Sequence, residues 1–378
     1  MKRPVSILKR FREGGLLGLT LCLGILSGCG KTSENTSSPT PPEHPVQISY
    51  FDADKGNLKY ATNASGIWDI QTPDGSPEVG SYSSIALDPS NQGYISYHDL
   101  GNGTLKFVTN PFGSWSFMTV DSLSNGDVGW YTSIAVDALG NAHISYYDAT
   151  NGDLKYATNS SGSWVPATVD SAGDVGQYSS IALDDSGKVH ISYYSLELGN
   201  LEYATCASNC TVPGNWTLTT VDSPGNGKYS SLALDASGKA RISYYDGSNK
   251  ALKYATNASG TWSFTTVDSP SNGDVGWYTS LALDSLGNAH ISYYDATNGD
   301  LKYATNSSGS WVPATVDSQG DVGRYSSLAL DTSGNAHISY YDGTNKVLKY
   351  ATNDTGGWVV TTVDSTGDVG SFSSIAVE

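Results

Sequence analysis

Arginine is scarce in this sequence. After the first 28 residues, only Arg241 and Arg324 occur. Residues 1–28 hold five of the 20 basic residues and one of the 37 acidic ones, so 15 basic and 36 acidic residues remain after them. Such an acidic surface repels nucleic acid and anionic lipid. We therefore expect no nucleic-acid partner. Because the acidic residues are spread through predicted turns, they indicate solubility.

Long hydrophobic runs are also absent except near the start. Basic residues precede an apolar run at 16–26, which is too short to stay in a bilayer as a spanning helix. The run ends in Leu26-Ser27-Gly28-Cys29, which resembles the lipobox of bacterial lipoproteins. The resemblance implies cleavage before Cys29 and its acylation. The alternative is an ordinary secretory signal with an incidental cysteine, and either way the protein is exported.

The start of the chain therefore divides into a signal peptide (1–28) and a lipidated Cys29 with a Ser/Thr/Pro-rich tether (29–45). The lipid would anchor the protein to a membrane of the bacterial cell envelope. Gly30 and Lys31 follow the cysteine, and the absence of an Asp there resembles lipoproteins sorted to the outer membrane. We expect the folded domain to occupy residues 46–378.

Cysteine is nearly absent from that domain, which has only Cys206 and Cys210. Two cysteines four positions apart in an exported protein most simply form a disulfide within a loop. The alternative is a metal site, for which no histidine or further cysteine lies nearby in the sequence.

A repeat of 47 to 51 residues fills the rest of the chain, and each unit has four strand-like runs separated by Gly, Asn, Asp and Ser. In one unit these runs are YTSLALD, AHISYYD, DLKYATN and WVPATVDS, and no helical period competes with them. The first aromatic of the first run marks each unit: Tyr82, Tyr131, Tyr178, Tyr229, Tyr278, Tyr325 and Phe372.

The two ends of the domain complete a seventh unit. Residues 46–80 supply its second, third and fourth strands, and residues 371–378 supply its first. Pairing these ends removes the open sheet edges. We predict an all-β, seven-bladed β-propeller of four-stranded antiparallel blades, closed by N- and C-terminal strands that share one blade, and monomeric.

The sequence also contains a longer repeat, in which a block of three consecutive units is duplicated. Residues 130–176 and 277–323 differ at four of 47 positions, and an offset of 147 also relates Tyr82 to Tyr229. Such likeness argues against a single catalytic site, which needs different residues converging from different blades.

A tryptophan precedes each fourth strand in the pattern YATNxSGxW, which resembles the Asp-box turn of sialidase-like (BNR) propellers. The resemblance implies a structural role, so we expect these tryptophans to be packing anchors. Sialidase activity requires three arginines, and two cannot supply them. The abundant Asp residues recur in every blade at turn positions, which is typical of scaffold rather than of a glycosidase pair.

Two further recurring residue types have structural interpretations. We expect Asp148 to lie directly across from Lys155 in a hairpin with Asn151-Gly152 as its turn, and the same ion pair in five other blades. One blade instead has Ser195 and Glu202. Histidines open four second strands, and we expect hydrogen-bonded surface residues rather than a metal site: His143, His190, His290 and His337.

The loops entering the blades read DSxGDVG and offer weak calcium candidates, for which ordinary Asx turns are the alternative: Asp170, Asp174, Asp317 and Asp321. We expect no cofactor.

Trp130 and Trp277 are not required by the repeat, because the equivalent positions elsewhere hold Ser, Gln, Lys or Arg. With Asp127 and Asp274 nearby they suit a sugar ring or a partner protein, although packing between blades is an alternative. The leading hypothesis is a non-catalytic binding module for carbohydrate or protein. The alternatives are a glycan-active hydrolase or lyase and a structural envelope scaffold.

Overall fold

The computed structural model describes residues 40–110, 113–124 and 126–378. The predicted signal peptide, Cys29 and most of the predicted tether lie outside the described residues. In the part that is described, no helix is both long and apolar enough to cross a membrane.

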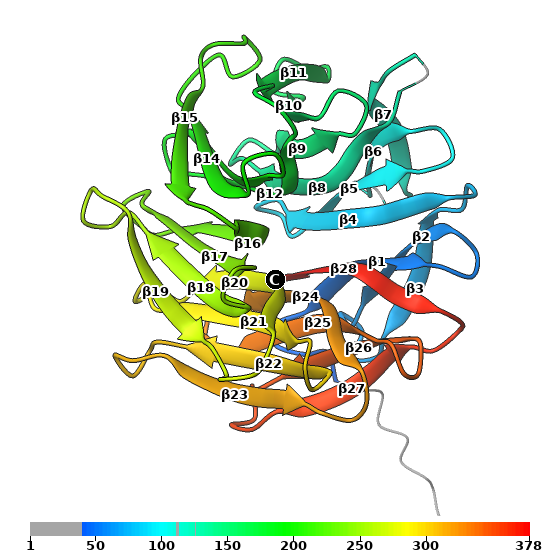
Figure 1. Ribbon diagram of the computed structural model, residues 1–378. Helices are drawn as coiled ribbons and strands as arrows, with labels where there is room; N and C mark the ends of the chain where they lie inside the picture. The colour runs from blue at the N-terminus through cyan, green and yellow to red at the C-terminus, as the bar shows by residue number, and fades with distance from the viewer. Residues whose placement is uncertain (1–39, 111–112, 125) are drawn as a thin grey trace, which may run out of the picture. The chain divides into compact units, whose positions relative to one another are not determined.

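The described residues form 28 strands in seven four-stranded antiparallel sheets, which are the blades of a propeller (Figure 1). We number the blades along the chain: blade 1 is β4–β7, blade 2 is β8–β11, blade 3 is β12–β15, blade 4 is β16–β19, blade 5 is β20–β23, blade 6 is β24–β27, and blade 7 combines β28 with β1–β3. The all-β, seven-bladed prediction is confirmed.

Within each blade the strands follow one another outward from the centre. The first, innermost strands are β4 (Val79–Leu87), β8 (Val128–Val136), β12 (Val175–Leu183), β16 (Asn226–Leu234), β20 (Val275–Leu283), β24 (Val322–Leu330) and β28 (Val369–Val377). The second strands are β5 (Gly93–Asp99), β9 (Ala142–Asp148), β13 (Val189–Ser195), β17 (Ala240–Asp246), β21 (Ala289–Asp295), β25 (Ala336–Asp342) and β1 (Val46–Asp52). The third strands are β6 (Thr104–Thr109), β10 (Asp153–Thr158), β14 (Asn200–Cys206), β18 (Ala251–Thr256), β22 (Asp300–Thr305), β26 (Val347–Thr352) and β2 (Asn57–Thr62). The fourth strands are β7 (Ser116–Ser122), β11 (Val165–Asp170), β15 (Thr217–Asp222), β19 (Ser263–Asp268), β23 (Val312–Asp317), β27 (Val359–Asp364) and β3 (Asp69–Asp74).

Blade 7 closes the ring with both ends of the domain. Strand β28 pairs antiparallel with β1, with Val377 opposite Val46 and Ile375 opposite Ile48. The Glu378 amide adds a hydrogen bond of 2.9 Å to the Pro45 carbonyl. Sharing a blade between the termini leaves the innermost strands in contact around a complete circuit, so the ring of blades is closed.

The hydrophobic core lies between blades rather than within them. The cluster between blades 4 and 5, for example, joins Leu252 and Tyr254 to Ile291 and Tyr293. The second strands β9 and β21 are buried along their whole length, including their His, Ser and Asp residues. Each tryptophan before a fourth strand packs edge-to-face on the third-strand aromatic ring of the preceding blade, at 4.9–5.4 Å between centroids. This is the expected packing role.

The predicted pairing of Asp148 directly across from Lys155 is wrong. Asp148 lies opposite Asp153, because the turn has four residues and the Asp148 carboxylate accepts hydrogen bonds from the amides of Thr150 and Asn151. The expected ion pair within a hairpin forms in three blades, at 3.1–3.8 Å.

All six lysines instead pair with the Asp at or next to the end of the fourth strand of the preceding blade. Lys349, for example, lies 2.9 Å from Asp317, and Tyr340 donates to the same carboxylate oxygen at 2.8 Å. The tyrosine bond recurs at all seven interfaces between blades. We call each set of Tyr, Lys and Asp an interblade clamp. In blade 3, Glu202 replaces the lysine beside Tyr193 and Asp170.

Candidate functional site

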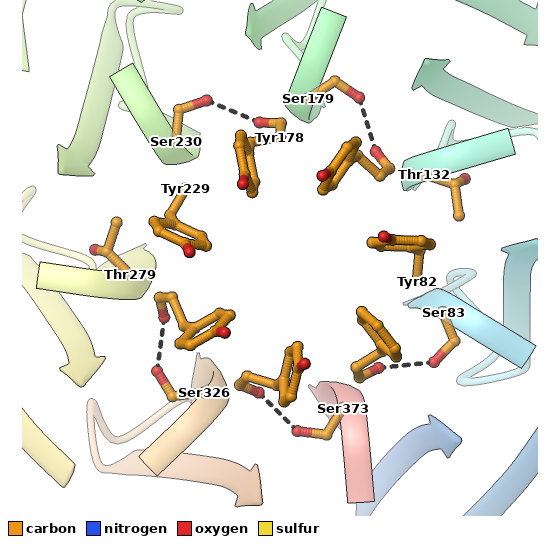
Figure 2. Close-up of a pocket in the computed structure, with 14 residues that line it drawn as sticks. Tyr82, Ser83, Thr132, Tyr178, Ser179, Tyr229, Ser230, Thr279, Ser326 and Ser373 are labelled. Carbon is orange, nitrogen blue, oxygen red and sulfur yellow. Dashed lines mark hydrogen bonds between the residues drawn. The ribbon is translucent and has the colours of Figure 1, made fainter. Parts of the chain in front are cut away.

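Seven aromatic side chains surround the propeller axis, one from each innermost strand, as Figure 2 shows for Tyr82, Tyr178 and Tyr229. Neighbouring rings lie 4.4–4.7 Å apart between centroids all the way around. We call this set the aromatic ring, and its members are the residues that mark the repeat: Tyr82, Tyr131, Tyr178, Tyr229, Tyr278, Tyr325 and Phe372.

The backbone is unusual at each member of the aromatic ring. All seven residues have a positive φ, between 51° and 57°. This left-handed conformation is rare for bulky residues and costs on the order of 1 kcal/mol each. A break in strand pairing between Gln177 and Ser180 leaves Tyr178 out of the ladder, which turns the side chain toward the axis. The recurrence of this strain shows that the fold is built to place aromatics in the channel.

Hydroxyl groups behind the aromatic ring hold it in place. Ser179 donates to the carbonyl of Tyr131, and Ser230 donates to that of Tyr178, both at 3.0 Å (Figure 2). A glycine two positions before each aromatic allows the close approach of blades, since a Cβ on Gly176 would lie 2.7 Å from the Leu154 Cα. The GDVGxY sequence therefore combines a close contact with an inward-facing aromatic.

The aromatic ring lines a cavity of about 180 Å³. Burial raises the pKa of Tyr82 to about 12 and raises the pKa of Tyr131 and Tyr178 as well. These three phenols are therefore protonated at neutral pH. They can donate hydrogen bonds, and their ring edges offer an apolar wall.

The residue before each ring aromatic differs between blades. These seven positions, which we call the mouth positions, lie on the side where the chain enters each blade: Ser81, Trp130, Gln177, Lys228, Trp277, Arg324 and Ser371. The blades otherwise repeat closely, so this variation indicates that the fold does not require a particular residue at the mouth positions.

Trp130 is half-buried and stacks on Tyr82 of the aromatic ring, with centroids 5.4 Å apart and planes at 28°. Its Nε1 donates to Asp127 Oδ2 at 2.9 Å. The other oxygen of Asp127 lies 2.8 Å from His98 Nε2. The structure thus brings the predicted pair Trp130 and Asp127 together at the rim of the cavity.

Trp277 repeats this arrangement three blades further on. It stacks on Tyr229 with planes at 23°, and its Nε1 donates to Asp274 Oδ1 at 2.9 Å. Tyr245 takes the place of His98 and packs against the indole at 5.9 Å. Since three of seven blades separate the two tryptophans, they lie on nearly opposite sides of the mouth.

The four calcium candidates are engaged in protein hydrogen bonds. Asp317 belongs to an interblade clamp and Asp170 accepts from Tyr193 at the equivalent place, whereas Asp174 accepts from Tyr147 at 2.8 Å and Asp321 accepts from Tyr294 at 2.7 Å. In the described part of the chain, no three His, Cys, Asp or Glu side chains group together in a way that could hold a metal ion.

The four second-strand histidines are hydrogen-bonded, but the expectation that they lie on the surface is wrong. Their exposed fractions are 3–8%. Each Nδ1 meets a third-strand tyrosine hydroxyl, as in His143 with Tyr156 at 2.6 Å, and each Nε2 faces an aspartate 3.4–3.6 Å away. Burial lowers their pKa values, so they are neutral at pH 7. On the same face of β9, Ser145 bonds to Ser179 of the next blade, so this face is covered in a way that a single repeat cannot reveal.

Cys206 and Cys210 form a disulfide, with Cα atoms 5.7 Å apart. The bond lies in the turn after β14, and the Cys210 carbonyl accepts from Trp216 Nε1 at 3.0 Å. It therefore belongs to the outer part of blade 3, between the third and fourth strands, whereas the mouth positions lie on the first strands.

The aromatic ring is the part of the site that sequence reasoning missed. Its tyrosines served only to mark the repeat, because a tyrosine in a strand ordinarily alternates between core and surface. The available signal was the glycine two positions earlier in every unit, which is typical of a bulge or a close approach.

Comparison with known proteins gives the fold alone. No protein-family model matches this chain, and no curated protein sequence is similar to it. The SapL1 lectin in complex with α-methyl fucoside is similar in structure, with a TM-score of 0.51 and 16% identity over 74% of this chain and 95% of the lectin. A putative 6-phosphogluconolactonase from Bacteroides uniformis has a TM-score of 0.58 and 9% identity over 89% of this chain and 99% of its own. The Hadza microbial sialidase Hz136 has a TM-score of 0.48 and 15% identity over 68% of this chain and 62% of the sialidase. The Asp-box resemblance stays a prediction.

Proposed function

We propose that this protein is an exported, non-catalytic module that binds carbohydrate at the mouth of the central cavity. The observation that carries the proposal is the pair of half-buried indoles, Trp130 and Trp277, at mouth positions where five other blades have different residues. The scaffold accepts Ser, Gln, Lys or Arg there, so packing alone does not account for tryptophan.

The chemistry around each indole suits a saccharide. Sugar rings present apolar C–H faces that pack on aromatic rings and hydroxyls that need polar partners. Asp127 and Asp274 supply carboxylate oxygens beside the two indoles, and the tyrosines of the aromatic ring supply hydroxyls. Two similar sites on one rim would add avidity to weak single sites. The lectin of similar fold, which carries α-methyl fucoside, supports the proposal that such a scaffold can hold a sugar.

The same proposal includes tethering of the protein to the bacterial cell envelope through a lipidated Cys29. The lipobox-like residues before Cys29 support it. Radiolabelled palmitate incorporated into the wild type and absent from a Cys29→Ser variant would establish the anchor, and equal labelling of both would reject it.

A glycan array with the purified mature protein tests the binding function. We expect selective glycan binding that falls at least about tenfold in the double variant Trp130→Gln and Trp277→Gln, because aromatic anchors dominate such sites. Glutamine already occupies this position in blade 3, so the fold should tolerate it. The control is Leu139→Ala with Leu286→Ala, which removes two exposed leucines from the same blades at the opposite ends of β8 and β20.

Two results would contradict the proposal. One is the absence of binding to any glycan. The other is binding that survives the tryptophan changes or is lost in the leucine control. Turnover of a bound glycan would reject the non-catalytic part alone.

A further inference from the structure

The three-blade duplication gives the mouth two halves that can be compared residue by residue. The offset of 147 relates Ser81 to Lys228, Trp130 to Trp277 and Gln177 to Arg324. We call the first three residues the neutral half-mouth and the second three the basic half-mouth. Both halves keep the tryptophan, and the basic half has a cation on each side of it.

A third difference changes the charge in the same direction. Glu78, in the loop that enters blade 1, corresponds to Gly225 in the loop that enters blade 4. The basic half-mouth therefore gains two positive charges and lacks one negative charge relative to its counterpart. With Asp274 and Asp321 counted, the formal charges of the basic half-mouth cancel, in a chain whose formal net charge is −17.

Lys228 has no carboxylate within ion-pair distance among the residues that the structure describes. Its Nζ lies over the Tyr194 ring, 5.7 Å from the centroid, and the Asp that accepts from the equivalent tyrosine in other blades is replaced by Gly225. Tyr194 and Lys228 thus face the mouth without the acid that closes this contact elsewhere. An ammonium group held in this way keeps its capacity to bind an external anion.

Arg324 is the exposed member of the basic half-mouth, with 44% of its side chain accessible. Its guanidinium contacts Asp321 at 2.6 Å and lies over the Tyr294 ring at 5.7 Å. Tyr294 is also the strand partner of Trp277 in blade 5, so the guanidinium lies over the blade that carries the indole. The scaffold does not need this cation, because the equivalent Asp174 stands beside Gln177 in blade 3. The guanidinium also has more donors than Asp321 uses.

We propose that the basic half-mouth binds an acidic saccharide, whose anionic groups contact Lys228 and Arg324 on either side of Trp277 while a sugar ring packs on that indole. The neutral half-mouth then takes an uncharged sugar on Trp130. This inference rests on the proposed function and specifies its ligand class. The duplicated site has thereby acquired two specificities on one rim, which suits a polymer that alternates acidic and neutral residues.

The experiment uses matched ligands that differ only in charge. Uronic-acid oligosaccharides and their carboxyl-reduced counterparts, and sulfated oligosaccharides with their desulfated forms, are titrated against the purified mature protein. We expect at least one acidic member to bind about tenfold more tightly than its neutral partner, with a preference that weakens as salt is raised.

The decisive variant is Lys228→Ser with Arg324→Gln, which gives the basic half-mouth the residues of the neutral half. It should abolish the preference for the acidic member and leave the binding of neutral sugars unchanged. The reverse variant, Ser81→Lys with Gln177→Arg, should raise the number of acidic ligands bound per protein and keeps the test valid if the first variant misfolds. Lys239→Ser, in the turn at the other end of β16, is the control for a lost charge.

The outcomes separate the two proposals. Neutral sugars bound with no acidic preference, or a preference that survives Lys228→Ser with Arg324→Gln, would overturn this inference and leave the proposed function intact. No binding of any member of either series would overturn this inference alone if the glycan array shows binding elsewhere, and would reject both proposals if the array shows none.

Discussion

Two aspartates that occupy the same place in different blades allow the interblade clamp to be measured against an internal control. Asp317 accepts from Tyr340 at 2.8 Å and pairs with Lys349 at 2.9 Å. Asp170 accepts from Tyr193 at 2.7 Å, but Glu202 stands where the lysine would be. We predict that Asp317→Asn destabilises the protein considerably more than Asp170→Asn does.

The expected loss of stability follows from the interactions that each Asp→Asn change removes. In both variants the tyrosine hydroxyl can still donate to the amide oxygen, so only the charge-assisted part of that bond is lost, about 1 kcal/mol. Asp317→Asn also removes a largely buried ion pair, with side chains 11% and 5% exposed. Because Lys349 keeps Asp342 at 3.3 Å, this loss is about 1–2 kcal/mol. In Asp170→Asn the repulsion of Glu202 is relieved instead, which offsets the loss at the tyrosine.

Thermal unfolding followed by circular dichroism measures the difference. A domain of this size has an unfolding entropy of about 0.7 kcal/mol per kelvin, from roughly 2.1 cal/mol per kelvin per residue. A loss of about 2–3 kcal/mol therefore lowers the midpoint by about 3–4 °C for Asp317→Asn, against about 1 °C or less for Asp170→Asn. Equal shifts in the two variants would refute the assignment of the stabilisation to the lysine pair.

Two further predictions concern the same clamps. Although burial alone would favour protonation of Asp317, hydrogen bonds from Lys349 and Tyr340 lower its pKa. The stability that the Asp317 carboxylate contributes is therefore present at neutral pH and lost as pH falls below about 4. The difference in unfolding midpoint between wild type and Asp317→Asn should narrow between pH 5 and pH 3, and a constant difference would contradict this linkage. Burial raises the pKa of Glu202. The variant Glu202→Lys places the lysine of the other six blades beside Asp170, so it should raise the unfolding midpoint at pH 7 by about 1–2 °C, corresponding to about 1 kcal/mol. A lower midpoint would show that the fit of the blades, and not charge, governs this position.

The physical role of the repeat also explains why the clamps escaped sequence reasoning. Asp121 and Lys155 are 34 residues apart and belong to different blades. Reasoning within one hairpin instead pairs Lys155 with Asp148, which is seven residues away. Tyrosines such as Tyr146 read as ordinary strand residues, yet they are fully buried and donate to the same aspartate. Contacts between blades depend on how the blades stack, which no single repeat contains.

The mouth shows the same division. The sequence alone singled out Trp130 and Trp277, since they interrupt a regular pattern. It did not indicate that their indoles stack on Tyr82 and Tyr229 of the aromatic ring, because each stacking contact joins one blade to the blade before it.

The number of blades, their strands and the closure of the ring followed from the sequence, because strand periodicity and turn residues are local signals and the incomplete units at 46–80 and 371–378 complement each other. Only the tertiary structure decided which side chains meet at the axis, which histidines are buried and which aspartate each lysine reaches. These contacts join residues from neighbouring blades, and their geometry depends on the left-handed backbone at the seven ring aromatics and on the close approach of each innermost strand to the third strand of the preceding blade.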